Sequence, residues 1–354
     1  MGQELLSVIE SWDGNGVVTR FDPPTGAWIF IGLHDSTLGP PTGGTRIKVY
    51  PELSAALTDA VRLAEGMTYK WAGLNMSFGG GKAVLALPKP IEGEERRGLL
   101  QRYGAFIESL SGSFKTGADL GASSEDMVTI ATRCSHVLGV DYTTMTPTDP
   151  GPFTAHGVLC GIQAALEKVF GSEDVAGRSV LIQGLGGVGA PLARSLAEED
   201  AEVILSDLDE GRAKALAQEL SCRAVASDQL YATPCDVYAP CAVGATLNHQ
   251  TIQQLACRIV AGSANNQLLE EDDADRLHQR DILYVPDYII NSGGAMAIAL
   301  MREGLTDRDE LMQRVATIRD AVGEILKAAV DGTSPVVAAR QRVDRILQEH
   351  RASS

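Results

Sequence analysis

The sequence contains no long hydrophobic segment. No apolar run in its 354 residues approaches the roughly 18 to 20 residues that a membrane-spanning helix requires. Residues 1–11 include Glu4 and Glu10 but no basic residue, so they lack the positively charged start of a secretory signal. We therefore expect a cytoplasmic protein with no membrane partner. The hydrophobic fraction of 44% and the length suit two globular domains.

Lysine is scarce in this chain. Only eight of its 30 basic residues are lysines, whereas the acidic residues number 46 and the formal net charge at pH 7 is −16. A surface this acidic repels phosphate backbones and anionic lipid headgroups. We therefore expect no nucleic acid partner, and a solvated acidic surface explains most of the excess charge.

Paired cysteines are also absent. No two cysteines form a Cys-x-x-Cys motif, and no histidine cluster accompanies them. In an intracellular chain of this size, isolated cysteines are typical of free, partly buried thiols. We therefore expect no disulfide framework and no metal site. The six are Cys134, Cys160, Cys222, Cys235, Cys241 and Cys257.

The first 140 residues predict a mixed α/β domain. Its expected strands are short apolar or β-rich runs at residues 28–33, 45–50 and 83–87. Its expected helices carry apolar residues at helical spacing and cover residues 54–73, 94–110 and 124–134. Residues 38–44, rich in glycine and proline, predict a loop, and the brief strand at residues 83–87 follows the glycines at 79–81.

The rest of the chain predicts a parallel, doubly wound sheet. Residues 143–152 are rich in Thr, Pro, Asp and Gly and indicate a hinge, so we place a domain boundary near residue 145. Strands alternating with helices are typical of parallel sheets. The expected strands are residues 179–183, 202–206, 237–238, 259–260 and 283–284, and the expected helices include residues 154–169, 188–199 and 212–220.

A glycine motif joins the first of these strands to its helix. Its pattern is Gly-x-Gly-x-x-Gly, in which the glycines allow a tight turn, close approach of a pyrophosphate and close helix–strand packing. Asp207 ends the next strand, where a carboxylate holds ribose hydroxyls. The motif predicts a dinucleotide site, and the acid favours NAD over NADP, although Arg212 follows closely; a glycine-rich turn in another α/β domain is the alternative. The motif residues are Gly184, Leu185, Gly186, Gly187, Val188 and Gly189.

Two of the few lysines stand in one apolar stretch. Lys70 and Lys82 are the only charged residues between residues 66 and 82, and the glycines at 79–81 precede Lys82 directly. Burial among apolar residues and a second cation nearby both lower a lysine pKa. The glycines allow positive φ or the close approach of a ligand. The alternative is a helix end and a glycine turn whose lysines reach solvent.

Together, these motifs resemble the Glu/Leu/Phe/Val amino acid dehydrogenase family, and most closely its leucine and phenylalanine dehydrogenase branch. The resemblance extends from about residue 38 to residue 298, and several separate motifs occur in one order. The matching segments are residues 43–46, 66–70, 79–82, 118–121, 183–186, 239–242, 262–267 and 286–294.

The resemblance implies roles for the charged residues. Members of the family oxidise an L-amino acid to its 2-oxo acid and ammonia, with hydride passing to a nicotinamide. By resemblance, Lys70 binds the substrate carboxylate, Lys82 activates water for attack on the imine, and Asp119 is the acid/base partner of Lys82. The chemistry needs a base that can be neutral near working pH, which a buried lysine provides.

Further binding residues also follow from the resemblance. The amide of Gly43 and the side chain of Asn265 are expected at the substrate carboxylate or amine, with Asn265 also beside the cofactor. Thr154 is expected at the nicotinamide carboxamide, and Ala239 and Cys241 along a cofactor ribose. A polar turn that satisfies its own backbone is the alternative for Asn265.

The side chain of the substrate is predicted to be apolar. Glutamate-specific members have a lysine where this chain has Thr42, and a hydroxyl cannot supply that charge. Gly117, Ala295 and Ile298 match other positions of the side-chain pocket, where Gly117 and Ala295 widen it as in phenylalanine-type members. One methylene changes discrimination by only about 1–3 kcal/mol. Leucine or another branched-chain amino acid is favoured slightly over an aromatic one.

The sequence therefore predicts an NAD-dependent L-amino acid dehydrogenase. By the resemblance, residues 1–145, with about 331–354 returning, form a substrate-binding and oligomerisation domain, residues 146–330 form a Rossmann NAD-binding domain, and a cleft separates them in a homo-oligomer. A non-catalytic NAD-binding homologue would have lost Lys70, Lys82 or Asp119, and an unrelated Rossmann reductase would not need the two lysines.

Overall fold

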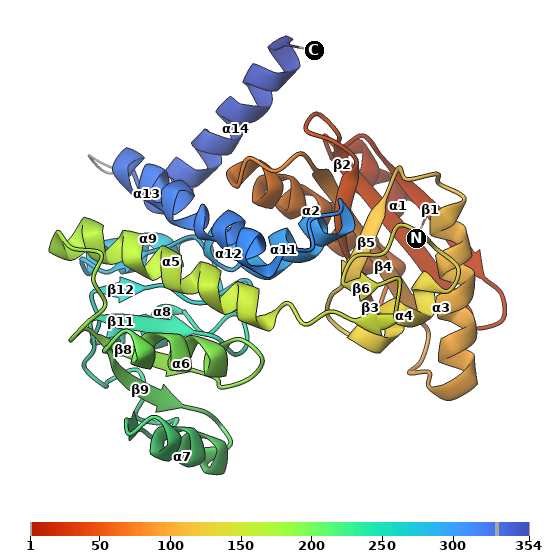
Figure 1. The fold of residues 1–354 in the computed structure, drawn as a ribbon. Coiled ribbons are helices and arrows are strands. Elements are labelled where there is room, and N and C mark those ends of the chain that lie inside the picture. Colours follow the sequence, from red (N-terminus) through yellow and green to blue (C-terminus); the bar gives the residue numbers. More distant parts are fainter. Residues whose placement is uncertain (1, 330–332, 354) are drawn as a thin grey trace. The chain divides into compact units, whose positions relative to one another are not determined.

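The structure, a computed structural model, divides into two compact units. It describes residues 2–329 and 333–353. The first unit comprises Met1–Asp149 and Val343–Ser354, and the second comprises Pro150–Arg342 (Figure 1). The domain boundary expected at residues 330–331 lies outside the described residues. Within residues 2–329 and 333–353, no helix combines the length and apolar character that a membrane crossing demands.

The first unit is built on a mixed five-stranded sheet with the strand order β1-β2-β4-β3-β5. Strand β2 pairs antiparallel with β1 and with β4, whereas β3 pairs parallel with both β4 and β5. The strands are β1 (Gly16–Asp22), β2 (Ala27–Asp35), β3 (Pro41–Val49), β4 (Gly79–Leu87) and β5 (Lys115–Ala118), with a small pair β6 (Val140–Asp141) and β7 (Thr146–Pro147). The helices are α1 (Gly2–Glu10), α2 (Leu53–Gly73), α3 (Gly93–Glu108) and α4 (Ser124–Ala131).

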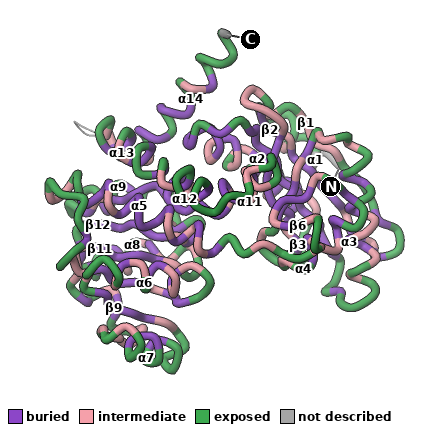
Figure 2. The backbone as a smooth tube through the Cα atoms, viewed as in Figure 1, coloured by how far each residue is buried: buried purple, intermediate pink, exposed green. Residues whose placement is uncertain are grey.

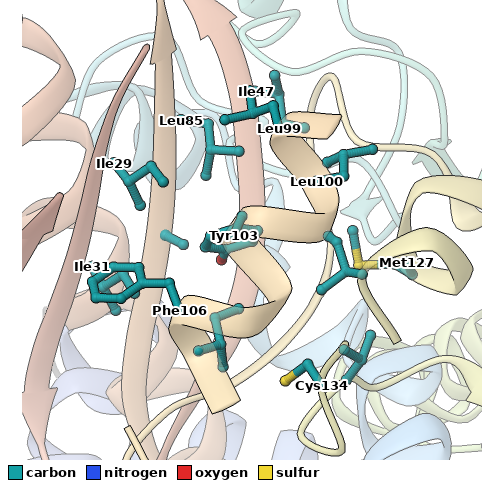
Figure 3. Close-up of a cluster of buried hydrophobic side chains, with 14 of the residues drawn as sticks. Ile29, Ile31, Ile47, Leu85, Leu99, Leu100, Tyr103, Phe106, Met127 and Cys134 are labelled. Atoms are coloured by element: carbon teal, nitrogen blue, oxygen red, sulfur yellow. The ribbon is translucent and has the colours of Figure 1, made fainter. Parts of the chain in front are cut away.

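Helices cover both faces of this sheet. Because side chains alternate along a strand, Phe30 and Val84 pack in one buried cluster with α2, and Ile29 and Leu85 pack in another with α3 and α4. Figure 3 shows the second cluster, in which Tyr103 of α3 lies among aliphatic side chains of the sheet. The even-numbered residues of β4 therefore face α2.

A buried hydroxyl network fixes β3 against β5 and α3. Thr45 Oγ1 lies 2.6 Å from Tyr103 Oη and 2.6 Å from Thr116 Oγ1. All three residues are buried, and buried hydroxyls are costly to leave without partners. The network therefore holds β3 and β5 in register. Strand β3 carries one charged residue of the candidate site, and another directly follows β5.

The glycine-rich stretches lie mostly in strands. The loop predicted at residues 38–44 is confirmed only for residues 38–40, and the alternative of a glycine turn at residues 79–81 is wrong. Strand β3 already begins at Pro41, and β4 begins at Gly79 rather than at residue 83. Gly79–Gly81 are absent from the positive-φ residues of the structure. A Cβ on Gly80 would lie 1.9 Å from Thr68 Oγ1 and 2.4 Å from the carbonyl oxygen of Ala64. Glycine is therefore needed here because α2 packs closely against the strand, and not because the chain turns.

The second unit contains a parallel sheet, as expected, but with six strands rather than the five predicted, because the short strand at Arg223–Ala224 was missed. Its strand order is β10-β9-β8-β11-β12-β13, which is the order of dinucleotide-binding folds, with the change of direction between β8 and β11. Figure 2 shows β9, β11 and β12 as largely buried. The strands are β8 (Ser179–Gln183), β9 (Glu202–Ser206), β10 (Arg223–Ala224), β11 (Val237–Pro240), β12 (Ile259–Val260) and β13 (Leu283–Tyr284).

Ten helices with described bounds belong wholly or partly to this unit. The long α5 (Gly151–Phe170) packs against α13 and α11, and α6 (Gly189–Glu198) follows the first strand of the sheet. The others are α7 (Glu210–Glu219), α8 (His249–Gln254), α9 (Asp273–Gln279), α10 (Asp287–Ile290), α11 (Gly293–Arg302), α12 (Arg308–Ala316), α13 (Ile318–Ala328) and the start of α14 (Pro335–Ser353).

The end of α14 belongs to the first unit. Val343 and Leu347 are buried against Ala72 of α2, and Tyr69 Oη donates a hydrogen bond to Asp344 Oδ1 at 3.1 Å. The C-terminal helix therefore supports the last turns of α2, from which Lys70 projects.

A substitution pair tests the packing of the glycine strand. We expect Gly80→Ala to lower the free energy of unfolding by about 3 kcal/mol, because its methyl group would overlap the backbone of α2. Gly66→Ala on α2 is the control: no atom lies within 4 Å of its Cβ position, so it should raise stability by about 0.5–1 kcal/mol. Urea denaturation of both variants measures the difference, and equal stabilities would contradict the packing described here.

Candidate active site

Lys82 lies on the α2 face of β4 and is almost completely buried. Only 6% of its side-chain surface is exposed, and Nζ lies 2.8 Å from Asp119 Oδ1. Asp119 directly follows β5. A buried ammonium needs a compensating anion, and Asp119 provides it. The two residues are 37 positions apart in sequence and meet because β5 ends beside β3, next to β4.

Arg46 extends this pair into a network. Its Nε lies 2.9 Å from Asp119 Oδ2, and its Nη1 lies 3.1 Å from Asp59 Oδ2. Tyr50 Oη donates to the same Asp59 oxygen at 2.7 Å. No role for Arg46, Asp59 or Tyr50 was predicted from the sequence, although Arg46 ends one of the matching motifs. Membership of that motif was the one sequence signal for Arg46, and it did not reveal the partners of the guanidinium.

Gly44 is required by the same network. A Cβ on this residue would lie 2.9 Å from Asp119 Cβ and 3.3 Å from Lys82 Nζ. The absence of a side chain on β3 therefore leaves the space in which the lysine and the carboxylate meet.

The environment favours an ionised Asp119 and a lysine that can lose its proton. Burial lowers the pKa of Lys82 below its usual value, and Arg46 lowers it further, while Asp119 and Asp59 oppose the change. Burial alone would raise the pKa of Asp119, but Lys82 and Arg46 outweigh it and lower that pKa to about 2. The pair thus places an anion beside a lysine that loses its proton more readily than an exposed lysine does.

The other predicted substrate residues of the first unit lie around this end of the sheet. Lys70 is in the last turn of α2 and is partly buried. Thr42 is buried on β3, where its Oγ1 donates to the carbonyl of Pro40 at 2.8 Å. Gly43 is buried beside it, and Gly117 is the partner of Gly44 in the β3–β5 register.

The glycine motif of the second unit forms a loop between β8 and α6. Gly184 has a φ of 89°, which favours glycine. A Cβ on Gly189 would lie 1.9 Å from the carbonyl oxygen of Gly184, so these two glycines close the turn. Gly186 and Gly187 have no atom within 4 Å of a Cβ position. The middle of the loop is therefore open to a ligand, and it fits a pyrophosphate at the start of α6.

Asp207 lies against this loop. The backbone N–H of Leu185 donates to Asp207 Oδ2 at 2.7 Å, and Arg212 Nη1 lies 3.6 Å from the same oxygen. Leu208 beside it is 91% exposed. The end of β9 therefore carries an anion next to the glycine motif, as a ribose-binding site requires.

The remaining predicted residues lie elsewhere in the second unit. Thr154 is in the first turns of α5, where its Oγ1 donates to the carbonyl of Pro150 at 3.0 Å. The backbone N–H of Cys241 donates to the carbonyl of Gln183 at 2.7 Å, which places the end of β11 beside the glycine motif, with Ala239 in the strand. Asn265 Oδ1 accepts from Asn291 Nδ2 at 2.7 Å. Ala295 and Ile298 are partly buried on α11.

The cysteines do not contribute to either group of residues as reactive thiols. All six are free, and burial raises the pKa of Cys160 to about 11 and that of Cys257 to about 12. In the part of the chain that the structure describes, no three His, Cys, Asp or Glu residues are grouped so that they could hold a metal ion.

Comparison with known proteins agrees with this geometry. Residues 26–136 match the model of the Glu/Leu/Phe/Val dehydrogenase dimerisation domain, and residues 205–347 match the Glutamate/Leucine/Phenylalanine/Valine dehydrogenase model. The chain therefore belongs to this family of amino acid dehydrogenases, oxidoreductases that act on a CH–NH₂ group with a nicotinamide cofactor.

Its relatives place it in the leucine, phenylalanine and tryptophan branch. Leucine dehydrogenase of Bacillus cereus is 36% identical over 354 residues, which are 100% of this chain and 95% of the relative. Phenylalanine dehydrogenase of Bacillus thermotolerans is 38% identical over 94% of this chain and 88% of its own. The crystal structure of L-tryptophan dehydrogenase from Nostoc punctiforme is 35% identical, with a TM-score of 0.87 over 98% of this chain and 100% of that one. The predicted family, fold class and enzyme class are confirmed.

Two glycines of the loop should differ in their effect when substituted. We expect Gly186→Ala to leave the melting temperature within about 1 °C of the unchanged protein, because its Cβ position is open, but to weaken dinucleotide binding roughly 10-fold by crowding the pyrophosphate. Gly189→Ala should lower stability by about 1–3 kcal/mol because its methyl group would overlap Gly184. Thermal melts and fluorescence titration with NAD measure both, and a strongly destabilised Gly186→Ala would contradict an open loop.

Proposed function

We propose that this enzyme catalyses the NAD-dependent, reversible oxidative deamination of an apolar L-amino acid to its 2-oxo acid and ammonia, with leucine or another branched-chain amino acid favoured. The observation that carries the proposal is the buried pair of Lys82 and Asp119, whose Nζ and Oδ1 atoms are 2.8 Å apart. A neutral residue, Thr42, stands in the neighbouring strand where glutamate-specific members have a lysine.

The two units have separate roles in this proposal. Residues 1–145, with the returning C-terminal segment, bind the amino acid and carry the oligomer contacts, and residues 146–330 bind NAD. The dimerisation-domain model matched by residues 26–136 supports the first assignment. The strand order of the second unit and its glycine loop support the other.

The substrate is bound before the chemistry begins. Lys70 pairs with its carboxylate, and the amide of Gly43 and the side chain of Asn265 hold its carboxylate or amine. Oxidation breaks the Cα–H bond and transfers a hydride to NAD, which is the chemistry the cofactor supplies. The substrate then carries a C=N bond that water must attack.

Lys82 acts in its neutral form at this stage. It accepts a proton from the attacking water, so a C–O bond forms at the former Cα and the nitrogen becomes a leaving amine. Asp119 stabilises the lysine when it is protonated and acts as its acid/base partner: it takes up a proton transiently and passes it to the amine nitrogen. The new hydroxyl group then loses its proton, the C=O bond forms, and the C–N bond breaks to release ammonia. Overall, amino acid, water and NAD⁺ give 2-oxo acid, ammonium, NADH and one proton. Burial of Lys82 makes the neutral form accessible.

The cofactor is held along one edge of the parallel sheet. The loop from Gly184 to Gly189, including Leu185 and Val188, binds the pyrophosphate, and Asp207 binds the adenosine ribose. Thr154 contacts the nicotinamide carboxamide, and Ala239 and Cys241 lie along the other ribose. The anion at Asp207 favours NAD, because a 2′-phosphate would be repelled; Arg212, with Nη1 3.6 Å from the Asp207 carboxylate, limits this preference.

Specificity is the least constrained part of the proposal. By the resemblance, the side-chain pocket is assigned to four residues, none of them charged: Thr42 and Gly117 of the first unit and Ala295 and Ile298 of the second. Phenylalanine or tryptophan is the alternative substrate, since Gly117 and Ala295 are small and since relatives named for both amino acids match this chain. Initial rates with all twenty amino acids, each with NAD and NADP, decide between these substrates.

The location and assembly are proposed on separate grounds. Six free cysteines suit a reducing compartment such as the cytoplasm. We also propose a homo-oligomer, in keeping with the dimerisation domain of the family model.

Replacement of Lys82 tests the chemistry. We expect Lys82→Ala to lower kcat at least about 10³-fold while the Kd for NAD changes less than about twofold, because the base is lost and the dinucleotide loop is untouched. Lys89→Ala is the control, because the Lys89 side chain is 67% exposed and its Nζ makes only a long contact of 3.9 Å with Glu95 Oε1. Turnover of Lys82→Ala within about tenfold of that of the control would remove Lys82 from this role.

Replacement of Thr42 tests the pocket. We expect Thr42→Lys to raise kcat/KM for glutamate relative to leucine at least about tenfold, because the new ammonium can pair with the side-chain carboxylate. The ratio of the two kcat/KM values is the measurement, with Thr42→Met as the control of similar length but no charge. If both variants give the same ratio, residue 42 does not face the substrate side chain.

A further inference from the structure

Lys82 and Asp119 are the inner end of a longer row of alternating charges in the first unit. Asp119 Oδ1 lies 2.8 Å from Lys82 Nζ, and its Oδ2 lies 2.9 Å from Arg46 Nε. Arg46 Nη1 in turn lies 3.1 Å from Asp59 Oδ2. The guanidinium thus bridges two carboxylates with two different nitrogens, which a lysine ammonium on a flexible stem cannot reproduce.

The bridge joins three parts of the fold. Arg46 is on β3, Asp59 is on α2, and Asp119 directly follows β5. The exposed fractions of the three side chains are 15%, 18% and 19%. Partial burial reduces screening by solvent, so these contacts are stronger than surface ion pairs.

The bridge also fixes the direction of the Asp119 carboxylate. Leu120, next to it, is 61% exposed, so apolar packing does not hold the loop at this point; the backbone N–H of Ile47 donates to the carbonyl of Leu120 at 2.9 Å. With Oδ2 bound by Arg46, Oδ1 is left to face Lys82 Nζ. Arg46 therefore sets which carboxylate oxygen meets the lysine and at what angle.

Charge balance gives the row a second effect. The row consists of four charges that alternate in sign and sum to zero, on Lys82, Asp119, Arg46 and Asp59. Removal of the charge of Arg46 or of Asp59 therefore leaves a net charge around the lysine. Without Arg46, the remaining anions would make Lys82 hold its proton more tightly. Without Asp59, the remaining cation would make Lys82 lose its proton more easily.

Other polar groups surround the row. Tyr50 Oη donates to Asp59 Oδ2 and is kept neutral, because burial and the Asp59 carboxylate raise its pKa. Arg62 Nη2 lies 2.8 Å from Asp59 Oδ1, but its side chain is 53% exposed and its charge is screened by solvent. Lys70 occupies the last turn of α2, and all variants below retain it.

We propose that Arg46 and Asp59 are positioning residues for the deamination reaction: Arg46 orients Asp119 toward Lys82, Asp59 anchors Arg46, and the two opposite charges set the pH range in which Lys82 acts as a base. The inference rests on the proposed roles of Lys82 and Asp119. Neither Arg46 nor Asp59 is assigned any contact with substrate or cofactor.

Two variants of opposite sign test this inference. The measurement is kcat/KM for the preferred amino acid between pH 7 and pH 11, where the rising limb reports the loss of the Lys82 proton. Because Arg46→Gln removes a cation that favours neutral Lys82, the midpoint should move to higher pH by roughly 1 unit. Because Asp59→Asn removes an anion that favours protonated Lys82, the midpoint should move to lower pH, by roughly half a unit.

A third variant distinguishes the effect of the Arg46 charge from the effect of its directed hydrogen bonds. Arg46→Lys retains the cation but not the two directed N–H groups, so the midpoint should stay within roughly 0.3 units while kcat falls roughly 10-fold or more. In Arg46→Gln both properties change. The KM for NAD should change less than about twofold in every variant, since the dinucleotide residues belong to the second unit.

Arg102→Gln is the matched control for loss of a partly buried arginine. Arg102 Nε lies 2.6 Å from Asp22 Oδ1, and the side chain of Asp22 is only 5% exposed. This variant therefore also leaves a buried carboxylate without its cation. We expect a lower melting temperature but an unmoved midpoint. Asp59→Asn preserves side-chain shape and keeps the test available if Arg46→Gln does not fold.

The outcomes separate this inference from the proposed function. Midpoints that move in the same direction, or no further than in Arg102→Gln, overturn the inference while amino-acid-dependent NADH formation by the unchanged enzyme still stands. Absence of NADH formation with every amino acid, or full turnover by Lys82→Ala, overturns the proposed function itself. Opposite shifts in Arg46→Gln and Asp59→Asn support the inference, because a purely structural role predicts no change of sign.

Discussion

The buried ammonium of Lys82 is the constraint on which the first unit depends. Because only 6% of its side chain is exposed, water solvates the charge poorly and protein groups must balance it. Asp119 balances it from the end of β5, Arg46 balances Asp119 from β3, and Asp59 balances Arg46 from α2. Each partner comes from a different element, so the sheet order and the position of α2 are both required before the lysine can be accommodated. The burial that makes Lys82 costly is also what makes its neutral form accessible.

Close packing provides the space for this network. Gly44 leaves room for Lys82 Nζ and the Asp119 side chain, and Gly80 lets β4 approach the backbone of α2. The hydroxyl contacts of Thr45 with Tyr103 and Thr116 hold β3 and β5 in register on the opposite face. Neighbouring side chains on opposite faces of β3 thus have separate roles. Thr45 contacts Tyr103 of α3, and Arg46 contacts the carboxylates of Asp59 and Asp119 on the α2 side of the sheet. A one-residue shift in β3 would exchange those tasks and leave a guanidinium in the apolar core.

Much of the fold followed from sequence patterns that act locally. The alternation of strands and helices after residue 179 predicted the parallel sheet, and the motif at Gly184–Gly189 lies between β8 and α6 as expected. The start of β4 at Gly79, rather than at residue 83, was missed because the strand geometry of these glycines depends on neighbours distant in sequence, Ala64 and Thr68, rather than on glycine's own preference for turns. Arg46 was missed for a similar reason: nothing near it in sequence shows that Asp59 and Asp119 will both lie within hydrogen-bonding distance. Local patterns predict elements, whereas charge networks exist only after those elements are packed.

The division between fixed chemistry and variable specificity follows from the same physics. Lys82, Asp119 and Arg46 hold one another by directed, partly buried charge contacts, so a change in any one leaves an uncompensated charge. Thr42 and Gly117, by contrast, are uncharged: the Thr42 hydroxyl already donates to the carbonyl of Pro40, and Gly117 has no side chain. Under the proposed roles, a methyl group gained or lost at such positions would change substrate discrimination by about 1–3 kcal/mol without removing a charge from the row. Relatives named for leucine and for phenylalanine are accordingly about equally similar to this chain, at 36% and 38% identity. Overall identity therefore does not distinguish one substrate from another, and the proposed specificity depends on the few uncharged residues assigned to the side-chain pocket.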